Sequence, residues 1–331
     1  MDEEVRLLLS EAPAPDLGAA DAVAERARNV LRPLGALERL DEIASWLASW
    51  QRTSRPSVDR PSLIVFVADH GVTAEGVSAY PSEVTAAMLK ALREGVATAT
   101  AMAKGLGVAI EVIDAGVGNP TNNFVNHDAL TPDRFRECFE IGRRAVAELE
   151  ADLLLFGDMG IGNTAAASAV TAALLNLPAE NVTGRGTGID DVTFARKKSV
   201  VETARRRTAG STPLEILRQV GGSELAAISG AAVEARLRSI PVVLDGFVVT
   251  ASVAPLEVLQ PGALDHCIAG HRSPEPGHGL LLERLAKQPI VDLELRLGEG
   301  TGALLAVPII RAGAAAITDV ATFEEWGLEG R

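Results

Sequence analysis

Two hydrophobic patterns alternate along this chain. Runs in which nearly every residue is apolar predict strands that are buried on both faces of a sheet, and they cover residues 62–68, 108–113, 153–156, 241–244, 266–269 and 290–295. Segments with apolar positions three and four residues apart predict helices, and they cover 81–104, a stretch from Thr131, another after Thr164, and 301–317. Alternating strands and helices are typical of an α/β fold with a doubly wound, mainly parallel sheet.

The N-terminal region departs from this alternation. Residues 1–20 are rich in Ala, Pro and Asp, and we expect them to be loosely held. Residues 22–50 have a helical pattern that Pro33 and Gly35 interrupt. The polar, proline-containing segment 51–60 then predicts a linker before the first strand.

The composition limits the classes of function. The 331 residues are 47% hydrophobic, which is enough to form a large core. With 44 acidic and 31 basic side chains the net charge is −13, which argues against a broad nucleic-acid-binding surface. Small anions can still bind, because a few backbone amides and one Lys or Arg suffice to hold them.

The cysteines and the N-terminus indicate the compartment. Only Cys138 and Cys267 are present, so we expect neither a disulfide framework nor a structural zinc site, and we expect a reducing compartment. The acidic N-terminus lacks the basic region of a signal peptide, and no uncharged run of about 18 apolar residues predicts a membrane span. We therefore expect a soluble, cytoplasmic protein.

Acidic residues follow four of the predicted strands: Asp69, Asp158, Asp245 and Glu299. The carboxyl ends of parallel strands meet at one edge of a sheet, and the ligands of such sheets bind there. We therefore expect these four side chains to converge on one cleft. The alternative is that several of them cap helices.

Glu299 is the strongest catalytic candidate. It lies between Gly298 and Gly300, at the junction of a predicted strand and a predicted helix. Glycine permits φ > 0 and a close approach of a ligand to the backbone, and a carboxylate at the end of a buried sheet is well placed to accept a proton. The alternative is a structural role, because Glu in a first helical turn favours the macrodipole and Thr301 is a suitable N-cap.

Two glycine-rich turns are candidate anion sites. Residues 157–164 open a helix, so free amides there suit a phosphate, and residues 183–188 form the second turn. Neither turn matches the dinucleotide-binding fingerprint or the P-loop. Arg196, Lys197 and Lys198 lie on a predicted helix after the second turn, and one of these cations is a candidate ligand for phosphate or carboxylate, with a solvated basic face as the alternative.

Two further polar loops carry candidate contacts. In the loop 271–278, Ser273 can donate to a phosphate or a ribose, with simple turn chemistry as the alternative. The spacing of the two histidines in that loop matches no common metal site. Tyr80, the only tyrosine, lies in a polar loop where it can flank a planar ligand or pack against the protein.

As a set, these motifs resemble one family, the nicotinate-nucleotide–dimethylbenzimidazole phosphoribosyltransferases of cobalamin synthesis. The resemblance spans about residues 28–325. Its matching stretches are Ala68–Val72, Gly76–Pro81, Gly157–Thr164, Gly184–Asp190, Leu244–Phe247, Gly270–His278 and Gly298–Ala303.

The resemblance implies an activity and a site. Enzymes of this family move the 5-phosphoribosyl group of nicotinate mononucleotide to 5,6-dimethylbenzimidazole, which gives α-ribazole 5′-phosphate and releases nicotinate. By this resemblance Glu299 is the general base, and Asp158 is a second catalytic carboxylate. The implied substrate contacts are Tyr80, Glu83, Gly160, Gly162, Asn163, Thr164, Gly186, Lys197, Asp245 and Ser273.

The resemblance also implies a homodimer without metal or cofactor, built from a Rossmann-like sheet and a small helical domain to which both chain ends contribute. We expect 1–60 to supply the N-terminal segment of that domain, 61–300 the catalytic domain, and 301–331 the C-terminal helices. Two positions depart from the family pattern, because Asp158 replaces a glutamate and Arg32–Glu38 replaces Lys-Pro-Pro-Gly-Ser-Leu-Gly. The alternatives are transfer to another azole or a purine, a sugar-phosphate or nucleotide hydrolase on the same sheet that activates water with a metal or paired carboxylates, and a non-catalytic nucleotide-binding protein.

Overall fold

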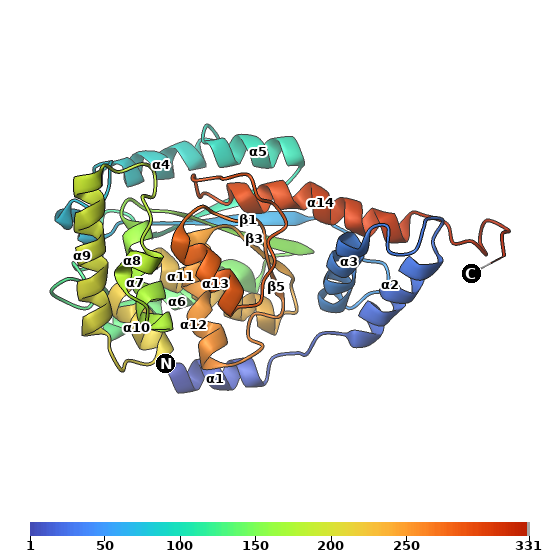
Figure 1. Ribbon diagram of the computed structural model, residues 1–331, viewed down its shortest axis with the longest axis horizontal. Helices are drawn as coiled ribbons and strands as arrows, with labels where there is room; N and C mark the ends of the chain where they lie inside the picture. Colours follow the sequence, from blue (N-terminus) through green and yellow to red (C-terminus); the bar gives the residue numbers. More distant parts are fainter. Residues whose placement is uncertain (330–331) are drawn as a thin grey trace.

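The computed structural model describes residues 1–329 and contains one sheet of five parallel strands, in the order β2-β1-β3-β4-β5 (Figure 1). The strands are β1 Pro61–Ala68, β2 Ala109–Gly116, β3 Leu153–Met159, β4 Val242–Leu244 and β5 Cys267–Ala269. The α/β class and five of the six predicted strands are confirmed. The strand order reverses between β1 and β3, and sheets of this kind bind ligands beyond the carboxyl ends of the strands at such a reversal.

Helices connect the strands and cover both faces of the sheet. Within the described residues they are α1 Asp2–Ser10, α2 Leu17–Asn29, α3 Glu38–Gln51, the 3-10 helix η1 Gly71–Glu75, α4 Val84–Arg93, α5 Thr98–Leu106, α6 Pro132–Ala147, α7 Asn163–Leu175, α8 Ala179–Val182, α9 Asp191–Arg207, α10 Pro213–Val220, α11 Ser223–Leu237, α12 Phe247–Leu259, α13 Pro276–Arg284 and α14 Thr301–Thr318.

Each face of the sheet has its own core, because successive side chains of a strand point to opposite faces. In β1, Leu63 and Val65 pack with residues of α4, α5 and α14. Ile64 and Phe66 pack with residues of α6, α11 and α12 on the other face. Figure 1 shows these two sets of helices on opposite sides of the strands. Burial on both sides explains why the strand is apolar at nearly every position.

α14 is a core helix. By length and composition alone it is apolar enough to cross a membrane. In the structure, however, Leu304, Val307 and Ile310 have no exposed surface and belong to the core on one face of the sheet. The apolar character of α14 is therefore accounted for by its packing against the sheet.

The N-terminal helices α2 and α3 lie beside the C-terminal end of α14 and the segment that follows it (Figure 1). Leu31 N donates to the carbonyl of Ala321 at 2.9 Å, and the Arg26 guanidinium binds both carboxylate oxygens of Glu325 at 3.1 Å. α2 and α3 pack against the second half of α14 through a small apolar cluster that includes Ile317. Segments at opposite ends of the sequence thus form one helical layer.

The prediction that residues 1–20 are loosely held is wrong. Val5 and Leu9 of α1 are buried in the main core, and Asp2 accepts a hydrogen bond from Leu214 N of α10 at 3.2 Å. The acidic residues Asp2, Glu3 and Glu4 lie in the first turn of α1, where they favour the helix macrodipole.

Two other predicted elements differ from the structure. The helix predicted over 81–104 is two helices, because Gly95 has φ 75° and the chain turns between α4 and α5. The strand predicted over 290–295 is not formed. Val291 makes a single parallel bridge to His271, and Glu294, with φ 54°, then turns the chain away from the sheet edge.

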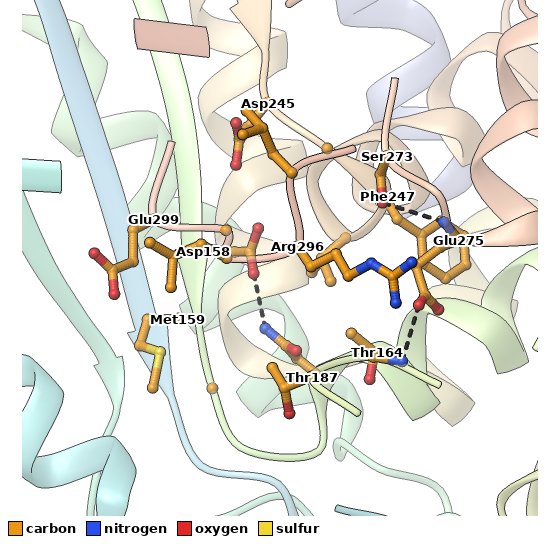
Figure 2. Close-up of a pocket in the computed structure, with 18 of the residues that line it drawn as sticks. Asp158, Met159, Thr164, Thr187, Asp245, Phe247, Ser273, Glu275, Arg296 and Glu299 are labelled. Atoms are coloured by element: carbon orange, nitrogen blue, oxygen red, sulfur yellow. Dashed lines mark hydrogen bonds between the residues drawn. The ribbon is translucent and has the colours of Figure 1, made fainter. Parts of the chain in front are cut away.

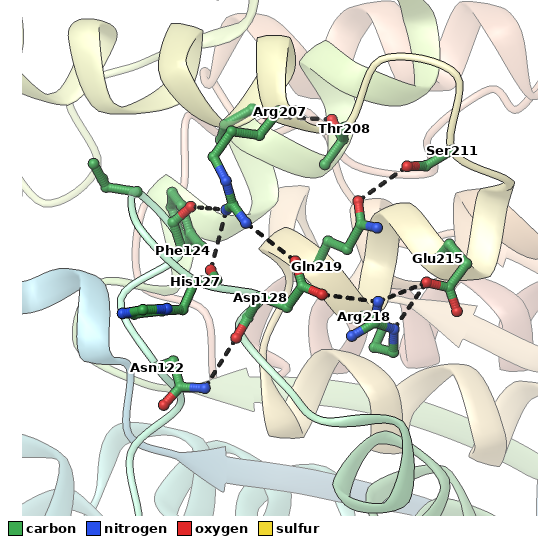
Figure 3. Close-up of polar contacts among 12 residues, drawn as sticks. Asn122, Phe124, His127, Asp128, Arg207, Thr208, Ser211, Glu215, Arg218 and Gln219 are labelled. Atoms are coloured by element: carbon green, nitrogen blue, oxygen red, sulfur yellow. Dashed lines mark hydrogen bonds and ion pairs between the residues drawn. The ribbon is translucent and has the colours of Figure 1, made fainter.

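The long loop after β2 is fastened to the helices that flank the site (Figure 3). The Asp128 carboxylate forms ion pairs with Arg207 at the end of α9, at 3.1 Å, and with Arg218 of α10, at 2.9 Å. The same α9 carries Lys197, so these ion pairs help to fix the helix that holds this cation.

Candidate functional site

A cavity of about 390 Å³ lies beyond the carboxyl ends of β3 and β4, next to the start of α14 (Figure 2). It contains nine of the twelve predicted site residues, namely Tyr80, Asp158, Gly160, Asn163, Thr164, Gly186, Asp245, Ser273 and Glu299. Figure 2 shows Glu299 and Met159 at one end of this cavity and Thr164, Ser273 and Glu275 at the other. Side chains from distant parts of the sequence therefore meet in one two-ended space.

Glu299 lies at the centre of an unusual turn. Gly298, Glu299 and Gly300 all have positive φ, at 85°, 59° and 82°. This conformation is unfavourable for a residue with a Cβ, and surrounding contacts have to hold it. Glu299 N donates to the carbonyl of Asp158 at 3.0 Å. A Cβ on Gly157 would lie 2.5 Å from Gly300 N, so β3 fits closely against the turn.

Asp245 caps α14. Its Oδ1 accepts hydrogen bonds from Gly302 N at 2.7 Å and Ala303 N at 3.0 Å, and its Oδ2 accepts one from Gly300 N at 3.1 Å. Burial raises the pKa of Asp245, while His271 and these amides act in the opposite direction. The capping alternative that the sequence left open thus applies to Asp245. The hydroxyl of Thr301 donates to Gly298 O instead of capping the helix.

The Glu299 carboxylate is buried, but it accepts no hydrogen bond from the first amides of α14. The residue is 1% exposed, and its Oε2 accepts one hydrogen bond from Ala99 N of α5 at 3.3 Å. Burial, and secondarily the charge of Asp245, raise the pKa of Glu299, and the Ala99 bond partly opposes this shift. A carboxylate with a raised pKa is a stronger base than an exposed one, as proton abstraction requires.

Asp158 points toward Asn163, away from the Glu299 carboxylate (Figure 2). Its Oδ2 accepts a hydrogen bond from Asn163 Nδ2 at 2.8 Å. Burial raises the pKa of Asp158 well above its usual value, and the charges of Asp245 and Glu224 raise it further. Asp158 therefore takes up a proton more readily than an exposed aspartate does.

The start of α7 offers free backbone amides. Gly160 N, Gly162 N and Thr164 N have no acceptor within residues 1–329. A Cβ at Gly160 would lie 2.6 Å from Ala68 O, so only glycine allows the turn to sit against β1. Amides at a helix N-terminus, together with the positive end of the dipole, suit a phosphate.

Lys197 links the two glycine-rich turns next to this end of the cavity. Its ammonium donates to Thr164 Oγ1 at 2.9 Å and to Gly184 O at 3.2 Å, and the side chain is 1% exposed. Burial lowers the pKa of Lys197 to about 8, and the charge of Glu275 opposes the shift. Because Lys197 occupies the acceptor side of the Thr164 hydroxyl, that hydroxyl is free to donate to a ligand.

The loop 271–278 supplies the remaining polar groups. Ser273 N donates to His278 Nδ1 at 3.0 Å, and burial lowers the pKa of His278 to about 3. The neutral ring therefore carries its proton on Nε2 and donates it to Thr250 Oγ1 at 3.1 Å. Ser273 Oγ accepts from Glu275 N at 3.3 Å, which leaves its own proton available to a ligand. Both ring nitrogens of His278 are therefore used in hydrogen bonds that hold the loop 271–278 in place.

Several predicted residues do not line the cavity. Asp69 faces the loop after β2, where its Oδ2 accepts from Gly118 N at 2.7 Å, so the prediction that it joins the other carboxylates is wrong. Glu83, Gly162 and Lys197 also lie outside the lining. Gly162, with φ 96°, and Lys197 support the turn instead. Tyr80 lines the cavity but remains 51% exposed.

Besides Thr187 and His271, two polar residues that line the cavity, Glu275 and Arg296, were not predicted as substrate contacts. Glu275 accepts a hydrogen bond from Gly186 N at 2.8 Å and so ties the loop 271–278 to the second glycine turn. Arg296 extends into the cavity from the segment before Glu299 (Figure 2). Both lie in or beside motifs that the sequence had singled out, but nothing in their spacing indicated which way they point.

Comparison with known proteins gives a consistent result. A family model described as phosphoribosyltransferase matches residues 12–328. Relatives named nicotinate-nucleotide–dimethylbenzimidazole phosphoribosyltransferase include those of Mesorhizobium japonicum, 45% identical over 98% of this chain and 97% of that protein, and of Cereibacter sphaeroides, 43% identical over 98% and 96%. The crystal structure of CobT from Thermus thermophilus is 42% identical and covers 94% of this chain and 99% of its own, with a TM-score of 0.89. The chain therefore belongs to the nicotinate-nucleotide–dimethylbenzimidazole phosphoribosyltransferase family.

Proposed function

We propose that this protein transfers the 5-phosphoribosyl group of nicotinate mononucleotide to 5,6-dimethylbenzimidazole, which yields α-ribazole 5′-phosphate and nicotinate. The observation that carries the proposal is the two-ended cavity. A buried carboxylate with a raised pKa, Glu299, lies at one end, and free amides of α7 lie at the other. Two substrates held between a proton acceptor and an anion site are what this reaction needs.

Glu299 acts in this proposal as the general base. It removes the ring N–H proton of the benzimidazole, and the freed nitrogen attacks C1′ of the nucleotide. The bond from C1′ to the pyridinium nitrogen breaks, and nicotinate leaves with the electron pair. Since the leaving group is already cationic at nitrogen, no acid is required to expel it. Met88, Met159 and Val84 line the same cavity and offer an apolar surface to a flat ring.

The opposite end binds the phosphate. Gly160 and Thr164, which line the cavity, supply backbone amides, and the hydroxyls of Thr164 and Ser273 have protons to donate. Orientation of two substrates in near-attack geometry can lower a barrier by ~7–11 kcal/mol. Asp245 has both oxygens engaged by α14, so its role is to position the Glu299 turn rather than to bind substrate. Asp158 holds Asn163 at the middle of the site.

Incubation with nicotinate mononucleotide and a panel of benzimidazoles and purines, with mass spectrometry of the products, tests the proposal. We expect an α-ribosyl phosphate adduct of dimethylbenzimidazole and an equal amount of free nicotinate. Nicotinate release that needs no acceptor base would indicate hydrolysis instead. No release with any base would indicate a binding protein.

The larger assembly is part of the same proposal. We propose a cytoplasmic homodimer in which 1–60 and the C-terminal helices form a small helical domain beside the catalytic domain of 61–300. The pairing of Arg26 with Glu325 and of Leu31 with Ala321 supports such a domain from both chain ends.

A further inference from the structure

The cavity is strongly acidic and contains one cationic side chain. Four carboxylates line it, namely Asp158, Asp245, Glu275 and Glu299, and Arg296 is the single Lys or Arg among the lining residues. Lys197 is enclosed beneath the glycine turns and does not line the space. A phosphate dianion that enters therefore meets one guanidinium on the side of the cavity that faces the α7 amides.

Arg296 is unengaged in the structure. It makes no hydrogen bond or ion pair with any residue of the described range 1–329. Many arginines of this acidic protein are paired, as Arg218 is with Glu215 and Asp128, whereas Arg296 shares its lack of a partner within residues 1–329 with the exposed Arg93, Arg144 and Arg284 and differs from them in lining the cavity. Figure 2 shows the Arg296 guanidinium directed toward the Thr164, Ser273 and Glu275 end, opposite Glu299. A planar fork of free N–H donors in that position matches the geometry of a phosphate.

The segment that bears Arg296 also bears Glu299, three residues later. The intervening turn is fixed by the bonds from Glu299 N to Asp158 O and from Gly300 N to Asp245. The turn therefore holds Glu299 in place, and the Arg296 side chain, three residues earlier, reaches the opposite end of the same cavity. A phosphate bound by Arg296 would lie across the cavity from the base.

We propose that Arg296 is a phosphate ligand of the nucleotide substrate, which binds the 5′-phosphate from the side opposite the α7 amides and so sets the sugar in register with Glu299. This assignment rests on the proposed function, since it identifies which part of that substrate the residue recognises. It adds to the amide contacts a charge-assisted, bidentate contact, which explains how an acidic cavity accepts a doubly charged group.

Steady-state kinetics of Arg296→Gln and Arg296→Lys with two donor substrates test the assignment. With nicotinate mononucleotide we expect KM to rise about 10- to 100-fold for the glutamine variant, and by less for the lysine variant, which keeps the charge but not the fork. With nicotinate riboside, which lacks the phosphate, both variants should match the wild type. Arg93→Gln, which removes an exposed arginine at the far end of α4, is the matched control and should leave both substrates unaffected.

Two results would overturn the assignment. The first is an equal loss with the riboside, which would mean that Arg296 shapes the site generally. The second is a loss that disappears with nicotinamide mononucleotide, which would mean that Arg296 binds the nicotinate carboxylate instead. Dissociation constants of the same ligands, measured by calorimetry, distinguish phosphate binding from these two outcomes without requiring turnover. If the wild type binds but does not transfer, the proposed function fails while the test of Arg296 still stands.

Discussion

The Asp245 carboxylate accepts a hydrogen bond from the backbone N–H of Gly300 at 3.1 Å, and so fixes the residue that immediately follows Glu299. Asp245 comes from the end of β4, while Glu299 and Gly300 precede α14. The backbone of the candidate base is thus held in an unfavourable conformation by a carboxylate that follows β4. This relationship makes the base dependent on a residue that does not react.

Removal of the Asp245 carboxylate should lower both stability and activity. In Asp245→Ala, three buried amides lose their acceptor, which we expect to lower the free energy of unfolding by about 1–3 kcal/mol and to slow transfer. Asp245→Asn keeps one acceptor oxygen and should lose less. Denaturant unfolding and initial rates measure the two effects. An alanine variant with wild-type stability would contradict the capping role.

Glu299→Gln tests the base directly. The amide has nearly the same size but cannot take a proton, so we expect kcat to fall by about 10²- to 10⁴-fold. Affinity for nicotinate mononucleotide should be retained, because the phosphate end is remote from this side chain (Figure 2). Nicotinate release and calorimetric affinity measure the two quantities. Turnover close to that of the wild type would refute the assignment.

The acid limb of the pH profile should report Glu299. The base acts only when ionised, and burial raises its pKa above the ordinary value of 4.5. We therefore expect kcat/KM to fall as the pH decreases through that raised pKa. An acid limb centred at or below 4.5, over a range in which circular dichroism shows an intact fold, would disagree with a buried base.

The alkaline limb should report Lys197, whose pKa burial lowers to about 8. Above that pH the charge beneath the phosphate turn is lost, so we expect nucleotide affinity to weaken. Lys197→Arg should remove the limb, because a guanidinium stays protonated. The folded protein should also become more stable as the pH rises from about 8 to 10.5, since the unfolded chain still binds this proton. Calorimetric affinity that does not vary over this range would contradict the prediction.

Gly157→Ala should damage the site through the backbone. The new Cβ would lie 2.5 Å from Gly300 N and 2.6 Å from the Glu299 carbonyl carbon, so the turn has to move. We expect a loss of about 1–3 kcal/mol in stability together with a fall in kcat. Gly105→Ala in α5 meets nothing within 4 Å and is the matched control, with unchanged activity and slightly raised stability. Equal behaviour of the two variants in thermal unfolding and initial-rate assays would rule out the close packing of β3 on the turn.

Local signals account for the parts of the fold that were predicted correctly. The five strands were predictable because they are buried on both faces, which requires an apolar residue at nearly every position. Glu299 was identifiable because two glycines flank it. The segment 290–295 misled because its apolar residues resemble a strand, whereas only one bridge forms and Glu294 turns the chain away.

The orientation of polar side chains was not predictable. Asp69 directly follows β1 and Asp158 lies near the end of β3, yet one binds the amide of Gly118 and the other faces the cavity. Their environments are set by loops far away in the sequence. Arg296 went unnoticed for the same reason, because its significance arises only from the four carboxylates that surround the same space.

The sequence by itself determined the α/β class, the positions of the core strands and the presence of a glycine-flanked carboxylate, because burial and backbone freedom leave local patterns in a chain. Only the tertiary structure decided that Asp245 caps α14, that Lys197 lies beneath the phosphate turn and that Arg296 faces the cavity. Those roles depend on which donors and charges lie within a few ångströms, and residues widely separated along the chain supply them.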